Sequence, residues 1–472
     1  MDGHAPAASR LDAVLARQDA DFDAALERLN DLLRIRSIST DPAYKADCLT
    51  AAESLAAELK DLGFEARVAP TTGHPMVVAH HDGASADAPH VLFYGHYDVQ
   101  PVDPIELWEA DPFDPEIKTR DDGSKFIRAR GAADDKGQLR TFIEACRAWK
   151  EETGTLPCKV TIFFEGEEET GSPSLEAWLT EHGEELKADF ALVCDTNMWD
   201  RTTPAITASL RGMTAGEVII KAASRDLHSG LYGGAARNPI TLLAQILGQL
   251  HDDDGRVVLP GFYDGVEDAP AEVIEQWKRL GFSEERFLGD VGLSRPAGEA
   301  GRMVLEQIWT RPTAEINGII GGYTGEGFKT VIPAKASAKV SFRLVAGQDP
   351  EKVWTAFEKH VTDRLPEDCE AVFNRRDTGA PALNVDVTNP ALQACVDALR
   401  DEWETEPALM GSGGSIPIVG DFKRHLGMDT ILAGFGLEDD NIHSPNEKYE
   451  LESFRKGIRS WARILERLAA KG

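Results

Sequence analysis

The chain has 472 residues, of which 42% are hydrophobic and 28% charged, a composition typical of a soluble globular protein with more than one domain. Acidic residues outnumber basic ones by 80 to 50, and the formal net charge of -30 argues against nucleic-acid binding, because phosphates would be repelled. No apolar run approaches the roughly 18 residues that a membrane-spanning helix needs.

The N-terminal residues and the cysteines predict a cytoplasmic location. No apolar segment follows a basic start, so we expect no secretion signal. The cysteines lack C-x-x-C spacing, and in a long chain without a signal we expect buried thiols rather than disulfides. They are Cys48, Cys146, Cys158, Cys194, Cys369 and Cys395.

The first third of the chain alternates predicted helices and strands. Apolar residues at helical spacing predict helices over residues 22–33 and 55–62, and a further helical pattern covers 139–149. Short apolar runs between turn or charged residues predict strands. This alternation predicts an α/β fold with a mainly parallel, twisted sheet flanked by helices. The strand runs are 76–80, 90–96, 159–166 and 190–195.

After about residue 212 the pattern changes. A strand-like run leads to a helix with leucines from 242 to 250, and residues 338–344 alternate between apolar and polar as in a half-buried strand. These elements predict an α+β domain at 212–381, inserted into a discontinuous catalytic domain at 1–211 and 382–472. Residues 252–311 show no clean period, and we interpret them as irregular lid structure.

The predicted strands end in potential metal ligands. In open α/β sheets, ligands bind beyond the carboxyl ends of the strands, so these groups are expected to converge. A further acidic pair, Asp134 and Asp135, precedes a predicted helix. The strand-end groups are His96 with Asp98, Glu167 to Glu169, Asp195, and His443 after a short loop.

This residue set favours catalytic metal chemistry. Two imidazoles with several carboxylates and no thiolate suit zinc, manganese or cobalt. A carboxylate that bridges two ions would support two-metal catalysis, and one unligated carboxylate would serve as general base. Each group alone also fits a plainer role: Asp134 and Asp135 could cap a helix, and the glutamates could form a solvated loop. The joint placement of the groups is what favours a site.

The motifs GHYDVQP, RGAADDKG, FEGEEETGS, DLHSGLYGG, GGSIP and HSPNEKYE resemble the aminoacylase–carboxypeptidase–carnosinase family of dinuclear zinc metallopeptidases. The resemblance spans residues 90 to 450, with the motifs in the family's order. Two details are similar to the carnosinase-like dipeptidases: GHYDVQP is followed by DPFDP, and NEK follows the last His.

The resemblance implies two divalent ions per subunit, zinc with manganese or cobalt as alternatives, in two sites that share Asp134. His96 and Asp195 would complete one site, and Glu169 and His443 the other.

The resemblance also implies roles beyond the ligands. Glu168 would be the general base, and Asp98 would fix the tautomer of His96. The peptide bond between Asp134 and Asp135 would be cis. No role follows for Glu165 or Glu167.

Substrate binding is implied for residues of the inserted domain. His228 would stabilise the oxyanion in the partner subunit of a homodimer formed through this domain, and Arg343 and Thr330 would hold the substrate's carboxylate. The GGSIP loop, with Gly414 and Ser415, would line the same pocket. One position departs from the relatives, which commonly have an Arg where this chain has Gly411, so carboxylate anchoring is left open.

The resemblance therefore predicts an enzyme that hydrolyses dipeptides or similar small peptides. An N-acyl amino acid amidohydrolase of the same family is the alternative. A catalytically silent binding homologue is a weaker one, because the ligands and the base are all present.

Overall fold

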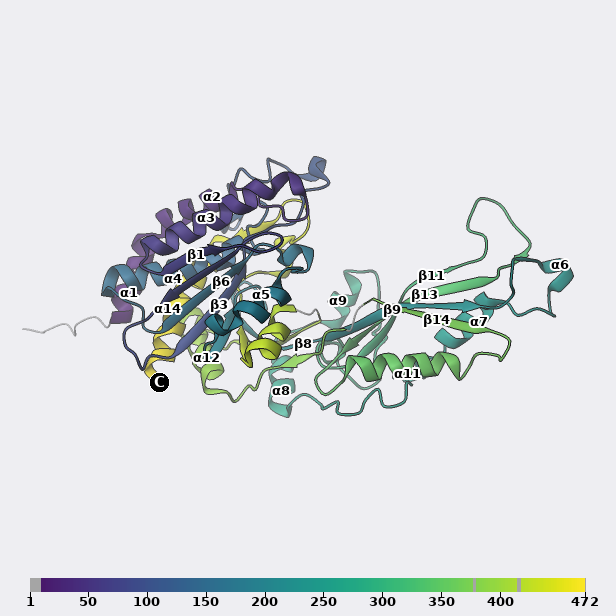
Figure 1. Cartoon of the computed structure of the whole chain (residues 1–472). Helices are drawn as coiled ribbons and strands as arrows, with labels where there is room; N and C mark the ends of the chain where they lie inside the picture. The colour runs from purple at the N-terminus through teal and green to yellow at the C-terminus, as the bar shows by residue number, and fades with distance from the viewer. Residues whose placement is uncertain (1–9, 377–378, 414–416, 472) are drawn as a thin grey trace, which may run out of the picture. The chain divides into compact units, whose positions relative to one another are not determined.

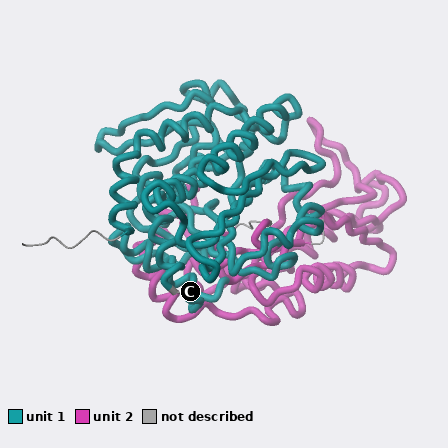
Figure 2. Tube along the Cα trace, turned by 60° about the vertical axis from the view of Figure 1, so that its left-hand side comes forward, with its two compact units in different colours: residues 1–208, 385–410, 421–472 teal, residues 209–384, 411–420 magenta. Residues whose placement is uncertain are grey.

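The computed structural model describes residues 10–376, 379–413 and 417–471. The chain forms two compact units, shown in teal and magenta in Figure 2. Unit 1 comprises Met1–Ala208, Val385–Met410 and Asp421–Gly472, and unit 2 comprises Ser209–Asn384 and Gly411–Gly420. Among the described residues, none of the helices is both long enough and apolar enough to cross a membrane.

A nine-stranded sheet of the described residues has the order β1-β2-β6-β3-β7-β17-β8-β15, with β16 paired to β8, and the six strands from β1 to β17 in this order lie in unit 1. The pairs β6–β3, β3–β7 and β7–β17 are parallel, so the centre of the sheet is parallel and antiparallel strands flank it. The predicted α/β class is thus confirmed. The strands are β1 (Glu65–Ala69), β2 (Met76–His81), β3 (His90–His96), β6 (Lys159–Glu165), β7 (Phe190–Val193), β8 (Ala205–Leu210), β15 (Leu383–Asn384), β16 (Ala408–Ser412) and β17 (Thr430–Leu432).

Both faces of this sheet are buried, which explains why its central strands are continuous apolar runs. Phe93 on β3 stacks on Phe142 with ring centroids 3.7 Å apart and meets Trp461 edge-on. The next residue, Tyr94, points to the other face and meets Phe422.

Helices cover the two faces (Figure 1). One layer contains α3 and α4, which pack on the strands, with α14 against α4 and α12 against α14. The helix α5 (Leu175–His182) covers the opposite face, where Trp178 stacks on Phe163. The helices of the first layer are α1 (Arg10–Ala20), α2 (Phe22–Leu33), α3 (Lys45–Asp61), α4 (Lys136–Thr153), α12 (Pro390–Trp403) and α14 (Leu451–Lys471).

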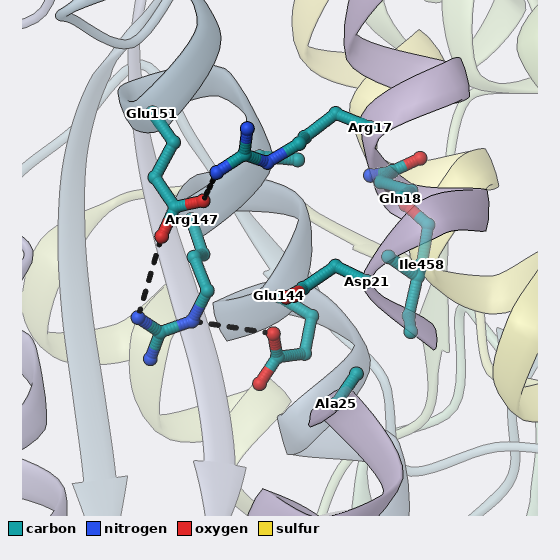
Figure 3. Close-up of a pocket in the computed structure, with 9 residues that line it drawn as sticks. Arg17, Gln18, Asp21, Ala25, Glu144, Arg147, Glu151 and Ile458 are labelled. Carbon is teal, nitrogen blue, oxygen red and sulfur yellow. Dashed lines mark hydrogen bonds and ion pairs between the residues drawn. The ribbon is translucent and has the colours of Figure 1, made fainter. Parts of the chain in front are cut away.

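Ion pairs join α1 to α4 around a cavity of about 10 Å³, room for one water at most (Figure 3). Arg17 of α1 lies 2.7 Å from Glu151 of α4, whereas Arg147 and Glu144, 3.3 Å apart, pair within α4. This cavity is too small to bind a ligand. The ion pair between Arg17 and Glu151 beside it fastens α1 to α4.

A small three-stranded sheet brings two distant segments together. The strand β18 (Lys448–Glu450) pairs with β5 (Lys125–Arg128), and β5 pairs with β4 (Glu116–Thr119). Because His443 lies shortly before β18 and Asp134 shortly after β5, this pairing places both residues at one end of the small sheet.

Unit 2 contains a four-stranded antiparallel sheet in the order β11-β13-β9-β14. Alternate residues of β13, from Ala336 to Leu344, join a core with residues of α7 and α11. Arg343 therefore lies on the face opposite this core. The elements are β9 (Gly212–Lys221), β11 (Thr313–Gly321), β13 (Lys335–Leu344), β14 (Glu370–Arg375), α7 (Pro239–Leu247) and α11 (Pro350–Thr362).

The interpretation of residues 252–311 as irregular structure is wrong in part. This segment contains three helices of six to nine residues, and Trp277 of α8 meets Trp309 of α10 with ring centroids 5.1 Å apart. Helices this short span about two and a half turns or fewer, which hides their period in the sequence. They are α8 (Ala271–Arg279), α9 (Glu284–Gly289) and α10 (Val304–Trp309).

Candidate metal centre

The predicted ligands come from separate elements at one edge of the parallel strands. His96 ends β3, Asp195 lies two residues beyond β7, and Glu169 follows β6 in a short 3-10 turn, η3 (Glu168–Thr170). Asp134 lies two residues before α4, and His443 follows η6 (Glu438–Asp440). The peptide bond between Asp134 and Asp135 is cis, as the resemblance implies.

Asp134 lies between two histidines. Its Oδ1 lies 3.0 Å from Nε2 of His96, and its Oδ2 lies 2.9 Å from Nε2 of His443. Asp195 Oδ2 is 3.8 Å from the first imidazole, and Glu169 Oε2 is 3.3 Å from the second. The ligand atoms of each group lie within 4.8 Å of one another. Two groups that share one carboxylate fit two cations bridged by Asp134.

The electrostatics of these residues favour bound positive charge. Burial is the largest single influence on the pKa of His96 and lowers it, but the hydrogen bonds with Asp134 and Asp98 and the negative charges of Asp134 and Glu168 together outweigh burial and hold this pKa well above the ordinary value. Hydrogen bonds with Asp134 and Glu169 raise the pKa of His443 to about 10. Burial and the negative charge of Asp134 raise the pKa of Asp195. Carboxylates that stabilise imidazolium this strongly also meet the charge requirement of divalent cations.

Asp98 connects the first histidine to the glutamate turn. The backbone oxygen of Asp98 lies 3.1 Å from Nδ1 of His96, and its Oδ1 lies 3.4 Å from the same nitrogen. The carboxylate also accepts hydrogen bonds from the backbone N–H groups of Glu168 (3.3 Å) and Glu169 (3.1 Å). An Nδ1–H that donates to Asp98 leaves Nε2 unprotonated for a metal ion, as a ligating imidazole requires.

Glu168 belongs to neither ligand group among the described residues. Burial raises its pKa to about 7, with the nearby charge of His96 acting in the opposite direction. A carboxylate that titrates near neutrality and is not itself a ligand is suited to accept and return a proton.

Glu447 supports the segment that carries Asp134, a role the sequence analysis missed. Its Oε1 accepts hydrogen bonds from the backbone N–H groups of Ala133 (2.9 Å) and Asp134 (3.0 Å). Its Oε2 accepts from the N–H of Gly131 (2.9 Å) and from Nη1 of Arg130 (2.7 Å). The motif HSPNEKYE contains this glutamate, but a backbone-binding role leaves no signal in side-chain spacing.

Glu167, which had no predicted role, supports the glutamate turn. Its Oε1 accepts a hydrogen bond from the N–H of His74 (2.9 Å), and its Oε2 accepts one from the N–H of Ser174 (3.1 Å). A Cβ at Gly73 would lie 1.5 Å from Oε1, so only glycine allows this close approach. Glu167 thereby fixes the turn that presents Glu168.

A third acidic cluster is not a metal candidate. Asp439, Asp440 and Glu450 are close enough together to hold an ion. However, Nζ of Lys448 lies 3.0, 2.5 and 3.2 Å from their oxygens, so an ammonium already satisfies them.

The predicted substrate residues lie in unit 2. His228 and Thr330 are exposed neighbours, because β10 (Leu227–His228) pairs with β12 (Val331–Ile332) and the N–H of Ser229 donates to the oxygen of Thr330 at 3.0 Å. Arg343 lies on β13. Gly414 and Ser415 lie outside the described residues.

The model of the peptidase family M20/M25/M40 matches residues 92–467. The chain belongs to this family. It is 30% identical over 456 residues to the Cys-Gly metallodipeptidase DUG1 of Candida albicans, covering 92% of each chain. It is 30% identical over 495 residues to the Beta-Ala-His dipeptidase of Homo sapiens, covering 98% of this chain and 94% of that one.

A solved structure of the M20 family metallo-carboxypeptidase Sso-CP2 from Sulfolobus solfataricus has a TM-score of 0.78 and 31% identity, over 94% of this chain and 99% of that one. The resemblance found in the sequence is therefore confirmed, and this M20 chain is a metallopeptidase.

Proposed function

We propose that this M20 peptidase hydrolyses dipeptides with two divalent metal ions, which are held by the two ligand groups that share Asp134. The observation that carries the proposal is the position of the Asp134 carboxylate, with one oxygen toward His96 and the other toward His443. The names of two relatives, a Cys-Gly metallodipeptidase and a Beta-Ala-His dipeptidase, support dipeptides as the substrate class. The nitrogen and oxygen ligands suit zinc, with manganese and cobalt as alternatives.

The ligand residues and Glu168 divide the chemistry. When bound, the two ions would polarise the scissile carbonyl and acidify the attacking water. Glu168 takes the proton of that water and passes it to the leaving amine, for which a pKa of about 7 is well matched. Asp98 keeps His96 in the ligating tautomer through the hydrogen bond at Nδ1.

His228 is suited to stabilise the oxyanion. Its Nδ1 accepts a hydrogen bond from the N–H of Gly230 at 3.0 Å, so the neutral ring carries its proton on Nε2. This side chain is exposed, and its Nε2–H is the donor that a tetrahedral oxyanion requires.

We infer that unit 2 is a lid and dimerisation domain and that His228 acts in the partner subunit. The strand β11 is an edge strand whose outer side is unpaired within the described residues, an arrangement that favours pairing with a second chain. Large apolar side chains are exposed on β11 and on the segments beside His228 and Thr330, as expected for an interface. They are Leu231, Tyr232, Ile316, Ile319, Ile320, Tyr323 and Phe328.

A cytoplasmic location completes the proposal. All six cysteines are free thiols and five of them are buried, which suits a reducing compartment.

The purified protein tests the function directly. Free dipeptides, N-acetyl amino acids and N-succinyl amino acids are compared as substrates, before and after removal of metal with a chelator. We expect hydrolysis of dipeptides that stops on chelation and returns with zinc, manganese or cobalt. Cleavage of the acylated amino acids alone would establish the amidohydrolase instead, and no cleavage by the metal-loaded protein would leave a binding homologue.

A further inference from the structure

Two arginines line one cavity of unit 2. The cavity has a volume of about 950 Å³, and its lining includes Arg211, which precedes β9, and Arg343 on β13. The two guanidinium groups repel one another, and the charge of Arg343 helps to lower the pKa of Arg211. Like charges in one cavity favour an anion bound between them.

Neither arginine has a carboxylate partner within 4.0 Å among the described residues, whereas the other arginines of this cavity do. Arg311 forms a bidentate pair with Glu299, with both distances 2.9 Å, and Arg302 lies 2.7 Å from Asp268. The two unpaired guanidiniums are therefore the cationic groups of the cavity that remain available to a ligand.

Arg211 is held in place by backbone groups rather than by a counter-charge. Its N–H donates to the oxygen of Ser412 at 3.1 Å, and its Nε donates to the oxygen of Gly413 at 3.4 Å. Burial, followed by the charge of Arg343, lowers the pKa of Arg211 to about 10. A cation that has lost water without gaining a counter-charge is costly, and an anionic ligand would offset that cost.

The space beside Arg211 also excludes one alternative source of positive charge. A Cβ at Gly411 would lie 2.4 Å from Cβ of Trp309 and 2.9 Å from Oγ of Ser209. A longer side chain at position 411 therefore cannot be accommodated without moving the tryptophan. A second cation for the cavity has to come from elsewhere, and Arg211 provides it.

We propose that Arg211 and Arg343 together bind the carboxylate of the peptide substrate, and that Arg211 determines the preference for a free carboxylate over a neutral C-terminus. This inference rests on the proposed dipeptidase function. The cavity also contains the acidic residues Glu315 and Asp252 to Asp254, which disfavour ligands with more than one negative charge. A peptide carboxylate carries a single charge and matches the planar fork of a guanidinium.

The experiment compares L-alanyl-glycine with L-alanyl-glycinamide, which differ in the terminal charge. Wild type, Arg211→Gln and Arg211→Lys are assayed with metal bound, and binding of both peptides to the chelated proteins is measured by calorimetry. We expect Arg211→Gln to lower kcat/KM for the free acid by about 10- to 100-fold, mainly through KM, with little change for the amide. Arg211→Lys should restore part of the loss. Arg286→Gln, which removes an exposed arginine of unit 2, is the charge-matched control.

The kinetic assay and the calorimetry together distinguish a failure of this inference from a failure of the proposed function. If the wild type hydrolyses neither peptide but calorimetry shows the acid preference and its loss in Arg211→Gln, the dipeptidase function fails and the carboxylate site stands. If Arg211→Gln affects acid and amide equally, or affects neither, Arg211 serves only to brace residues 412 and 413 and the inference is overturned. The inference is also overturned if the wild-type protein binds neither peptide. It is overturned as well if the wild-type protein shows no preference between the acid and the amide in either the kinetic assay or the calorimetry.

Discussion

The carboxylate of Glu447 accepts a hydrogen bond from the backbone N–H of Asp134 at 3.0 Å. Glu447 is buried and lies four residues after His443 in the chain. A single side chain thus links the segment of one metal ligand to the backbone of the ligand that both metal groups share. Three backbone N–H groups and one guanidinium converge on this carboxylate, so its loss would leave buried donors without partners.

Glu447→Ala should therefore weaken metal binding without removing a ligand. We expect a 10- to 100-fold loss of metal affinity, roughly the effect of removing a residue that orients metal ligands, and a lower melting temperature. Chelator competition and thermal unfolding with and without metal measure both effects. Glu452→Ala removes an exposed carboxylate near the same segment and should bind metal normally. Unchanged metal affinity in Glu447→Ala would contradict the positioning role.

Glu168→Gln should keep both metal ions and lose most of the activity. The amide preserves the size of the side chain but cannot accept a proton, so we expect kcat to fall by about 10²- to 10⁴-fold with a small change in KM. Metal analysis of the same sample shows whether the ligands are intact. A metal-loaded Glu168→Gln enzyme with near-wild-type turnover would rule out Glu168 as the base.

Metal binding should release protons, and the affinity should rise with pH. In chelated protein the pKa of His443 lies at about 10 and that of His96 is also raised, so at pH 7 both imidazoles carry protons that a metal must displace. Raising the pH removes these protons beforehand, and the competition weakens. Calorimetry of zinc binding at pH 7 in buffers of different ionisation enthalpy should detect a release of at least two protons, since Asp195, with a pKa of about 8, also carries one in the metal-free protein. Affinity that is independent of pH between 6 and 9 would contradict this expectation.

The convergence of the predicted ligands could be expected from the sequence, because His96 ends a buried strand and Asp195 and Glu169 follow two others within four residues. Strands such as β3 and β7 are apolar on both faces, and this pattern is visible without a structure. A polar residue at the end of such a strand, as His96 is, therefore stands out. The edge of the sheet at which these residues meet follows from the parallel order.

The supporting residues could not be predicted, because their partners are backbone groups or distant cations. Glu447 and Glu167 bind N–H groups, which every sequence contains. The strand β18 has three residues, too few to show alternation, so its pairing with β5 left no pattern. Arg211 lies next to Gly413 only because β8 pairs with β16, a contact between segments some 200 residues apart.

The proposed action of His228 across the dimer can be tested by complementation. A mixed dimer of His228→Ala and Glu168→Ala subunits has one site with neither residue and one site with both, if His228 comes from the partner. Random assembly makes half of the dimers mixed, so we expect about a quarter of wild-type activity from two inactive variants. Co-expression with two affinity tags isolates the mixed dimers.

The matched control pairs Glu168→Ala with His443→Ala, since both residues belong to unit 1 and no complete site can form. If verified mixed dimers of His228→Ala and Glu168→Ala are as inactive as this control, His228 acts within its own subunit or not at all. Activity in the first pair alone would establish that each metal centre is completed by the exposed His228 of the second chain.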